Sequence, residues 1–151
     1  MALTSLNLSD CDKITDVGVL AVSGMPALTS LDLSFNEEIT DAVQAVSDMP
    51  ALKSLSLCSS TEITDVGVQA VSGMPALTYL QLNLLDKLTD VGVQAVSGMT
   101  ALTSLQLNLL DKLTDVGRDE LVCSSAAVKC ARATPRTSCP RVFGRSSSTR
   151  L

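Results

Sequence analysis

The stretch KLTDVGVQAVSGMTALTSLQLNLLDKLTDVG, residues 87–117, begins and ends with the same six residues. It belongs to a longer periodicity, in which the frame A-L-x-x-L-x-L occurs five times at steps of 25, 24, 25 and 25 residues. The first leucine of the frame stands at Leu3, Leu28, Leu52, Leu77 and Leu102. A fixed period of this length indicates an array of stacked supersecondary units.

The spacing of apolar residues changes half-way along each unit. In the first copy, residues 6–8 alternate apolar and polar, which predicts a short strand whose leucines face one side. Between Ile14 and Met25 apolar residues recur at spacings of three to five, which suits one face of a helix. The unit is therefore predicted to be one strand followed by one helix.

The ends of the predicted helix carry recognisable signals. Thr15 and Asp16 indicate its start, because a side-chain oxygen there can accept from unpaired backbone N–H groups. Gly24, Met25 and Pro26 indicate its stop. The second copy is one residue shorter after its aspartate, so we expect a shortened first helical turn around Ala42 in that copy.

One strand and one helix cannot bury their own apolar faces, whereas stacked copies can. We therefore predict an α/β solenoid, a right-handed arc with a curved parallel sheet of about five strands inside and the helices outside. Pro, Ser and Arg dominate the end of the chain and predict disorder there. The predicted copies are residues 2–26, 27–50, 51–75, 76–100 and 101–122, followed by an irregular or disordered basic tail over 123–151.

The unit resembles the leucine-rich repeat, and more narrowly its cysteine-containing subtype, which runs roughly L-x-x-L-x-L-x-x-C-x-x-I-T-D-x-G-L-x-x-L. The first copy matches at Leu3, Leu6, Leu8, Cys11, Ile14, Thr15, Asp16 and Gly18. Only this copy keeps the cysteine, which the later copies replace by Asn36, Ser60, Leu85 and Leu110. The subtype is common in the substrate-recognition halves of F-box proteins, which deliver targets to cullin-type ubiquitin ligases. The resemblance implies a protein-binding solenoid and associates it with ubiquitination.

Charge is divided unevenly along the chain. Residues 1–117 hold 4 lysines and 14 acidic residues, a net charge of −10, whereas residues 118–151 have a net charge of +5. Phosphate contacts need a basic face, so the acidic array is not expected to bind nucleic acid. The basic tail is suited to an acidic surface, which could be that of its own solenoid.

The composition also bears on compartment and cofactors. The sequence has no apolar run of about 18 residues and no secretory signal pattern, so we expect no membrane association. Its five cysteines without such a signal suggest free thiols in the cytoplasm or nucleus. Cys123, Cys130 and Cys139 are spaced by 7 and 9, which matches no metal pattern, and histidine is absent. We therefore expect neither a metal site nor a cofactor.

Catalysis requires a positioned nucleophile, an acid–base pair or a metal. The ordered array of acidic residues in this sequence is one aspartate per copy, immediately after the threonine of the I/L-T-D motif. These carboxylates could form a cation-binding ridge, but we favour five helix N-caps, each serving its own helix. We expect no catalytic residue and no enzymatic activity. The array comprises Asp16, Asp41, Asp65, Asp90 and Asp115.

The outward positions of the strands form the candidate binding surface. They carry mainly small uncharged polar groups, and Tyr79 is the one residue there of a type that dominates binding energy at protein interfaces. The surface is therefore either a weak or wet binding site or merely solvated. The expected partner-binding residues are Ser5, Asn7, Ser30, Asp32, Lys53, Ser54, Ser56, Tyr79, Gln81, Asn83, Ser104, Gln106 and Asn108.

A second candidate surface lies in the NLLDKL loops of the fourth and fifth copies. Leu85 and Leu110 take the cysteine position and are expected to point inward. Leu84 and Leu109 would then face water and form a possible apolar patch, a common contact signal. The alternative is a local rearrangement of the core.

The sequence supports two hypotheses for function. The first is a non-enzymatic protein-interaction module that uses its concave face, which the resemblance associates with substrate recognition for ubiquitin-dependent degradation. The alternative is a fragment of a longer repeat array with a structural role or no independent function. Because Leu3, Leu6 and Leu8 directly follow Met1 and Ala2, we also expect an uncovered N-terminal edge, so that the isolated chain either self-associates through this edge or is only marginally stable alone.

Overall fold

The computed structural model of the chain describes residues 2–108, 113 and 114. Its five strands form one parallel sheet in chain order, and a helix follows each of the first four. The predicted α/β solenoid is thereby confirmed, whereas the fifth helix and the tail lie outside the described residues. The elements are β1 (Ser5–Asn7), α1 (Asp16–Ser23), β2 (Ser30–Asp32), η1 (Asp41–Asp48), β3 (Ser54–Ser56), α2 (Asp65–Ser72), β4 (Tyr79–Gln81), α3 (Asp90–Ser97) and β5 (Ser104–Gln106).

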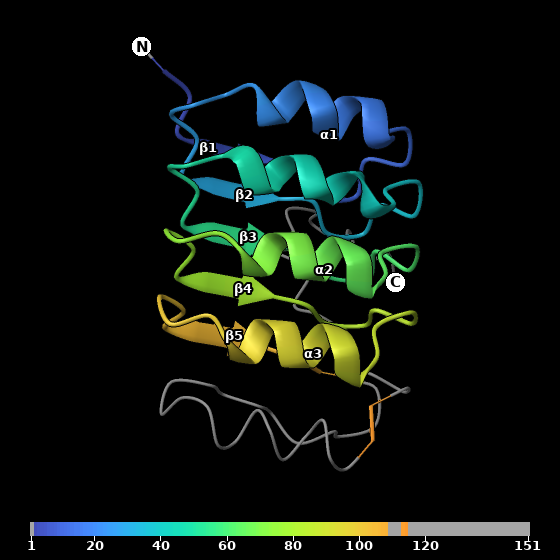
Figure 1. The fold of residues 1–151 in the computed structure, drawn as a ribbon. Coiled ribbons are helices and arrows are strands. Elements are labelled where there is room, and N and C mark those ends of the chain that lie inside the picture. Colours follow the sequence, from blue (N-terminus) through green and yellow to red (C-terminus); the bar gives the residue numbers. More distant parts are fainter. Residues whose placement is uncertain (1, 109–112, 115–151) are drawn as a thin grey trace, which may run out of the picture.

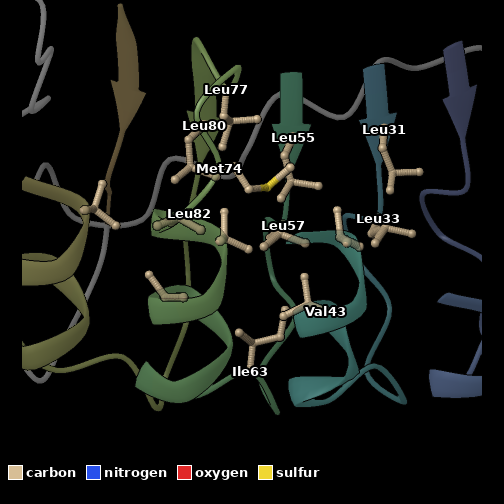
Figure 2. Packing of buried hydrophobic residues seen from close by; sticks show 14 of the residues in the cluster. Leu31, Leu33, Val43, Leu55, Leu57, Ile63, Met74, Leu77, Leu80 and Leu82 are labelled. Atoms are coloured by element: carbon tan, nitrogen blue, oxygen red, sulfur yellow. The ribbon is translucent and has the colours of Figure 1, made fainter. Parts of the chain in front are cut away.

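Strands and helices form two stacked layers (Figure 1), and the buried hydrophobic side chains of the core lie between them (Figure 2). Corresponding residues of successive copies lie side by side in this core, as Leu33, Leu57 and Leu82 show (Figure 2). All three side chains are at most 1% exposed. Burying one leucine side chain contributes about 1.5–3 kcal/mol. Repeated leucine columns are therefore the main source of stability, and each needs a neighbouring copy to be complete.

The second copy absorbs its missing residue along a whole helix. Asp41–Asp48 forms a 3₁₀ helix of eight residues, the same number as each α-helix has. The expected shortened turn around Ala42 is present as a 3₁₀ turn, but it is not confined to the first turn and continues along the whole helix. A 3₁₀ helix rises about 2.0 Å per residue instead of about 1.5 Å, so its eight residues span a greater length than eight α-helical residues, which offsets the missing residue. Val43 and Val46 remain fully buried in this arrangement.

The cysteine position holds the turn after each strand in different ways. Asn36 is 1% exposed, and its Nδ2 donates to the carbonyl oxygens of Leu8 and Leu33, both at 2.9 Å. Its Oδ1 accepts from the backbone N–H of Cys11 at 3.0 Å. Asn36 therefore bridges the first and second copies. Leu85 is fully buried at the same position, as expected, and fills it with apolar volume instead.

The aspartates of the I/L-T-D motif connect neighbouring copies. Each carboxylate accepts one hydrogen bond from the backbone N–H and one from the Oγ1 of the threonine in the next copy. We call this pair of bonds the aspartate–threonine clamp. The expectation that each aspartate caps its own helix is therefore wrong. The four clamps join Asp16 to Thr40, Asp41 to Thr64, Asp65 to Thr89 and Asp90 to Thr114.

At the starts of α2 and α3 the capping side chain is threonine instead of aspartate. The Oγ1 atoms of Thr64 and Thr89 accept from the backbone N–H groups of Val66 and Val91 at 3.2 and 3.3 Å. Each helix begins at the predicted Asp, and the α-helices end just before the predicted glycine. The I/L-T-D-x-G motif thus combines a local helix cap with a bond between copies.

Candidate functional site

Strand register brings the outward-facing side chains of the sheet into two continuous columns. We call the surface formed by these columns and the flanking Lys53 the open face. Most of its side chains are partly exposed, and Ser5, Asn7 and Lys53 are exposed. The first column is Ser5, Ser30, Ser54, Tyr79 and Ser104, and the second is Asn7, Asp32, Ser56, Gln81 and Gln106.

Two of the expected partner-binding residues, Asn83 and Asn108, follow the strands and lie outside the two columns of the open face. Asn83 is 3% exposed, and Ser34 and Cys58 beside it are also buried. The Oδ1 of Asn83 accepts from the backbone N–H of Asn108 at 2.9 Å, and its Nδ2 lies 3.6 Å from the Cys58 Sγ. The expectation that Asn83 contacts a partner is therefore corrected: its side chain joins copies from within. Asn108 is half-buried.

The middle of the open face contains a hydrogen-bonded group on β3 and β4. The Tyr79 hydroxyl donates to Gln81 Oε1 at 3.0 Å, and Ser56 Oγ donates to the same oxygen at 3.3 Å. We call these three residues the tyrosine cluster. Tyr79 and Gln81 are two residues apart on one strand, so both side chains lie on the same side of the sheet. The cluster fixes an aromatic ring and an amide in a surface of small hydroxyl groups.

The residues immediately before the strands are mostly threonines, and their hydroxyls are less available to a partner than the sequence suggests. Thr29, Thr78 and Thr103 each direct their Oγ1 to a backbone carbonyl oxygen of the preceding copy, at 2.9, 3.1 and 3.0 Å. These hydroxyls therefore hold copies together. Lys53 takes the equivalent position, is exposed, and immediately precedes Ser54, the residue opposite Tyr79 in the sheet.

The turn after each strand repeats an unusual backbone conformation. Asp10, Phe35, Ser59 and Leu84 have φ angles of 58°, 61°, 56° and 59° at equivalent positions. This is the left-handed region, which side chains other than glycine rarely occupy. Leu84 is half-buried there instead of open to water, and its expected neighbour Leu109 lies outside the described residues. The structure thus provides only half-exposed apolar surface for the predicted patch.

An acidic hollow lies at the turns of the first three copies. It has a volume of about 340 Å³ and is lined by Asp10, Asp12, Phe35, Glu37, Glu38 and Ser59. Sequence reasoning did not identify this hollow, because it combines residues from loops about 25 positions apart. Four carboxylates in one hollow give this end of the solenoid a strongly negative surface.

The aspartate column offers little to a cation, since its carboxylate oxygens already accept hydrogen bonds from threonine. Within residues 2–108, 113 and 114, no three His, Cys, Asp or Glu side chains are grouped so that they could hold a metal ion. Cys11 and Cys58 are thiols and form no disulfide, and the Cys58 Sγ lies within hydrogen-bonding distance of Ser56 Oγ and Asn83 Nδ2. No helix in the described part of the chain has the length and hydrophobicity needed to cross a bilayer.

Comparison with known proteins supports the fold. The family model described as leucine rich repeat matches residues 2–59 and 50–113. Among solved structures, the yeast Rad7–Elc1 complex contains a similar chain, with a TM-score of 0.62 and 23% sequence identity. The match covers 76% of this chain but only 30% of that one. No curated protein matches the sequence.

Proposed function

Because the chain belongs to the leucine-rich repeat family, we propose that it is a non-enzymatic interaction module that binds a protein partner on its open face. The tyrosine cluster is the observation that supports this proposal most. Tyrosine gives a large contact area at a low cost in conformational entropy, and it is frequent at the centre of protein interfaces.

The cluster is also ordered before any partner arrives. Tyr79 and Ser56 both donate to Gln81 Oε1, so the Gln81 side chain has already lost part of its rotational freedom. Immobilising a flexible side chain on binding costs about 0.5–1.5 kcal/mol, and prior ordering reduces this cost. A preordered centre supports binding, even though most of the open face consists of serine hydroxyls.

Charges on either side of the cluster would orient the partner. Lys53 is exposed beside β3, and Asp32 lies on β2 next to Ser56. Opposite charges around an interface mainly set its register and specificity. We propose a polypeptide segment that crosses the strands and presents an acidic group to Lys53 and a basic group to Asp32.

We further propose that this recognition serves ubiquitin-dependent degradation. The proposal is based on the resemblance of the first copy to the cysteine-containing repeat subtype, through Cys11, Ile14, Thr15, Asp16 and Gly18. Affinity capture should then recover ligase subunits together with a target protein. Capture of partners without any ligase subunit would count against this role and leave binding on the open face intact.

The test of the open face is a comparison of three baits. The double variant Tyr79→Ala/Gln81→Ala removes the cluster, and Gln69→Ala/Gln94→Ala changes two exposed helix residues as a matched control. Loss of an interface tyrosine often costs about 2 kcal/mol or more, so we expect affinity for a captured partner to fall at least about 30-fold. The control should bind like the original chain. Equal binding by all three would overturn the open-face assignment, and absence of any partner would favour a purely structural role.

We also propose that the chain associates with itself through its N-terminal edge. β1 is the first strand of the sheet and pairs with β2 along one side. A strand edge with open backbone groups is a template for pairing with another chain.

A further inference from the structure

The first copy has the threonine of an aspartate–threonine clamp, but within the described residues no aspartate is bound to it. Thr15 takes the position that Thr40, Thr64 and Thr89 take in later copies, where each receives a carboxylate from the copy before it. Within the described residues, no carboxylate accepts from Thr15, and its Oγ1 does not cap its own helix. The same motif is thus present without its acidic partner.

The space next to Gly18 is also open, whereas the equivalent glycines of later copies are in close contact with the copy before them. At Gly67, the equivalent glycine of the third copy, an added Cβ would lie 2.7 Å from Val43 Cγ1 and 2.9 Å from Asp41 Oδ1. At Gly18 the nearest atom would be Ile14 Cγ2 of its own copy, at 3.5 Å. Glycine at this position makes room for a docked neighbour, and at Gly18 that room is unused.

The apolar side chains of the first copy are exposed where later copies cover theirs. Leu3 is 51% exposed, whereas the equivalent Leu28 is completely buried. Leu6, Leu8, Ile14 and Met25 are only partly buried, although they contact the core. We call the surface formed by these five residues, Thr15, Gly18 and the β1 edge the end face.

The backbone groups at the β1 edge are the same donor and acceptor that neighbouring copies use to pair with each other. Between neighbouring copies, Leu33 N–H donates to Ser56 O at 3.0 Å, and Ser54 N–H donates to Thr29 O at 3.0 Å. The equivalent groups at the β1 edge are Asn7 O and Ser5 N–H. A strand docked in parallel on β1 would meet the same acceptor and donor as it does inside the solenoid.

The charge of the first two copies favours a basic partner surface at the end face. Residues 1–50 hold eight acidic residues and one lysine, so two end faces repel each other. Residues 118–151 carry a net charge of +5 and follow the last Thr-Asp pair, Thr114 and Asp115. The fifth repeat of a second chain therefore carries the acidic residue of the motif and is followed in sequence by a basic segment.

Building on the proposed self-association, we propose that its geometry is head to tail: the C-terminal end of one copy docks on the end face of the next, with a carboxylate bound to Thr15. A contact between two different surfaces does not close on itself unless the rotation forms a ring. The association therefore continues beyond a dimer. Attraction between the basic and acidic ends is screened by salt, so high ionic strength opposes it.

Sedimentation velocity over a range of concentrations tests this geometry with the full chain. Gly18→Leu fills the room that a docked copy needs, while the Cβ it adds makes only ordinary contact in the isolated fold, 3.5 Å from Ile14 Cγ2. Gly73→Leu is the matched control, because Gly73 is exposed at a helix end and its added Cβ makes ordinary contact with Ala70 O at 3.4 Å. Thr15→Val removes the hydroxyl of the clamp with little change in shape. Circular dichroism checks that each variant keeps its helices.

We expect the original chain and Gly73→Leu to form growing oligomers, and Gly18→Leu to stay near the monomer mass of 15.8 kDa. Thr15→Val should raise the concentration for half-assembly by about tenfold or more. An original chain that is monomeric at all concentrations would overturn both self-association and its geometry. Growth that stops at a dimer, or that persists in folded Gly18→Leu, would leave self-association standing and overturn the head-to-tail arrangement.

Discussion

The carboxylate of Asp65 accepts two hydrogen bonds from Thr89, one from the backbone N–H at 2.8 Å and one from Oγ1 at 2.6 Å. The same carboxylate accepts from the backbone N–H of Gly92 at 3.1 Å. Three donors from one copy therefore converge on a single side chain of the copy before it. Hydrogen bonds to a charged group contribute about 1.5–3 kcal/mol each, more than neutral ones.

Substituting Asp65→Asn should weaken this junction without changing its shape. An amide NH₂ in place of Oδ2 cannot accept from the Thr89 hydroxyl, so we expect the free energy of unfolding to fall by about 1–3 kcal/mol. Urea denaturation followed by circular dichroism measures this change. Asp48→Asn, at an exposed end of η1, removes the same charge and should stay within about 0.5 kcal/mol. Equal losses in the two variants would show that net charge, and not the clamp, determines the effect.

Gly92→Ala should destabilise the chain even though alanine favours helices. An added Cβ would overlap Leu88 Cδ1 and lie 2.5 Å from Asp65 Oδ1. The leucine can move, but the carboxylate is held by Thr89, so we expect a loss of about 1–3 kcal/mol. Gly98→Ala is the control, because its Cβ would lie 3.6 Å from the nearest atom, Ala95 O. A thermal melt in which Gly92→Ala is as stable as Gly98→Ala would contradict the close approach of the copies.

Asn36→Ala should cost more than Ser60→Ala at the equivalent position. The Asn36 substitution removes the Nδ2 donor from the carbonyl oxygens of Leu8 and Leu33 and the Oδ1 acceptor from the Cys11 N–H, although Leu33 O keeps the Ser60 Oγ donor. Ser60 donates one long bond, at 3.3 Å, to Leu33 O. An unsatisfied buried group costs about 1–3 kcal/mol, so the difference between the two variants should exceed about 1 kcal/mol in denaturant titrations. The reverse order of stability would rule out a bridging role for Asn36.

Ser59 tests the left-handed turn. Its φ of 56° suits glycine and disfavours a β-branched side chain, for which this conformation is an outlier. We expect Ser59→Val to lower the free energy of unfolding by about 1–2 kcal/mol and Ser59→Gly to lower it little or not at all. Both variants can be compared in one urea series. If valine and glycine gave the same midpoint, the turn would have to adopt another conformation in solution.

The strand columns could be predicted from the sequence because five copies share one frame. Equal spacing places Ser54 opposite Tyr79 and Ser56 opposite Gln81, whatever the details of the helices. The alternation of inward and outward side chains did not predict the position of Asn83. The reason is that β4 ends at Gln81 and the backbone then enters the left-handed turn at Leu84. An outward position within a strand thus became an inward position within a turn.

The role of the aspartates could not be decided from one copy. An aspartate at the first residue of a helix suits its own helix dipole and equally suits a donor on the neighbouring copy. Only the stacking distance makes the second choice available to Asp16, Asp41 and Asp65. Likewise, the missing residue of the second copy could have been absorbed at one turn, but burial of Val43 and Val46 favours a change along the whole helix.

The clamp has a consequence for how the gene can change. Because Asp41 and Asp65 form the same bonds to the next threonine, excision of one complete repeat would bring Asp41 opposite Thr89 and restore the junction. Duplication of a repeat would add a junction of the same kind. Unequal recombination between such similar segments can therefore lengthen or shorten the array without a compensating mutation, whereas a break inside a repeat leaves one aspartate and one threonine unmatched.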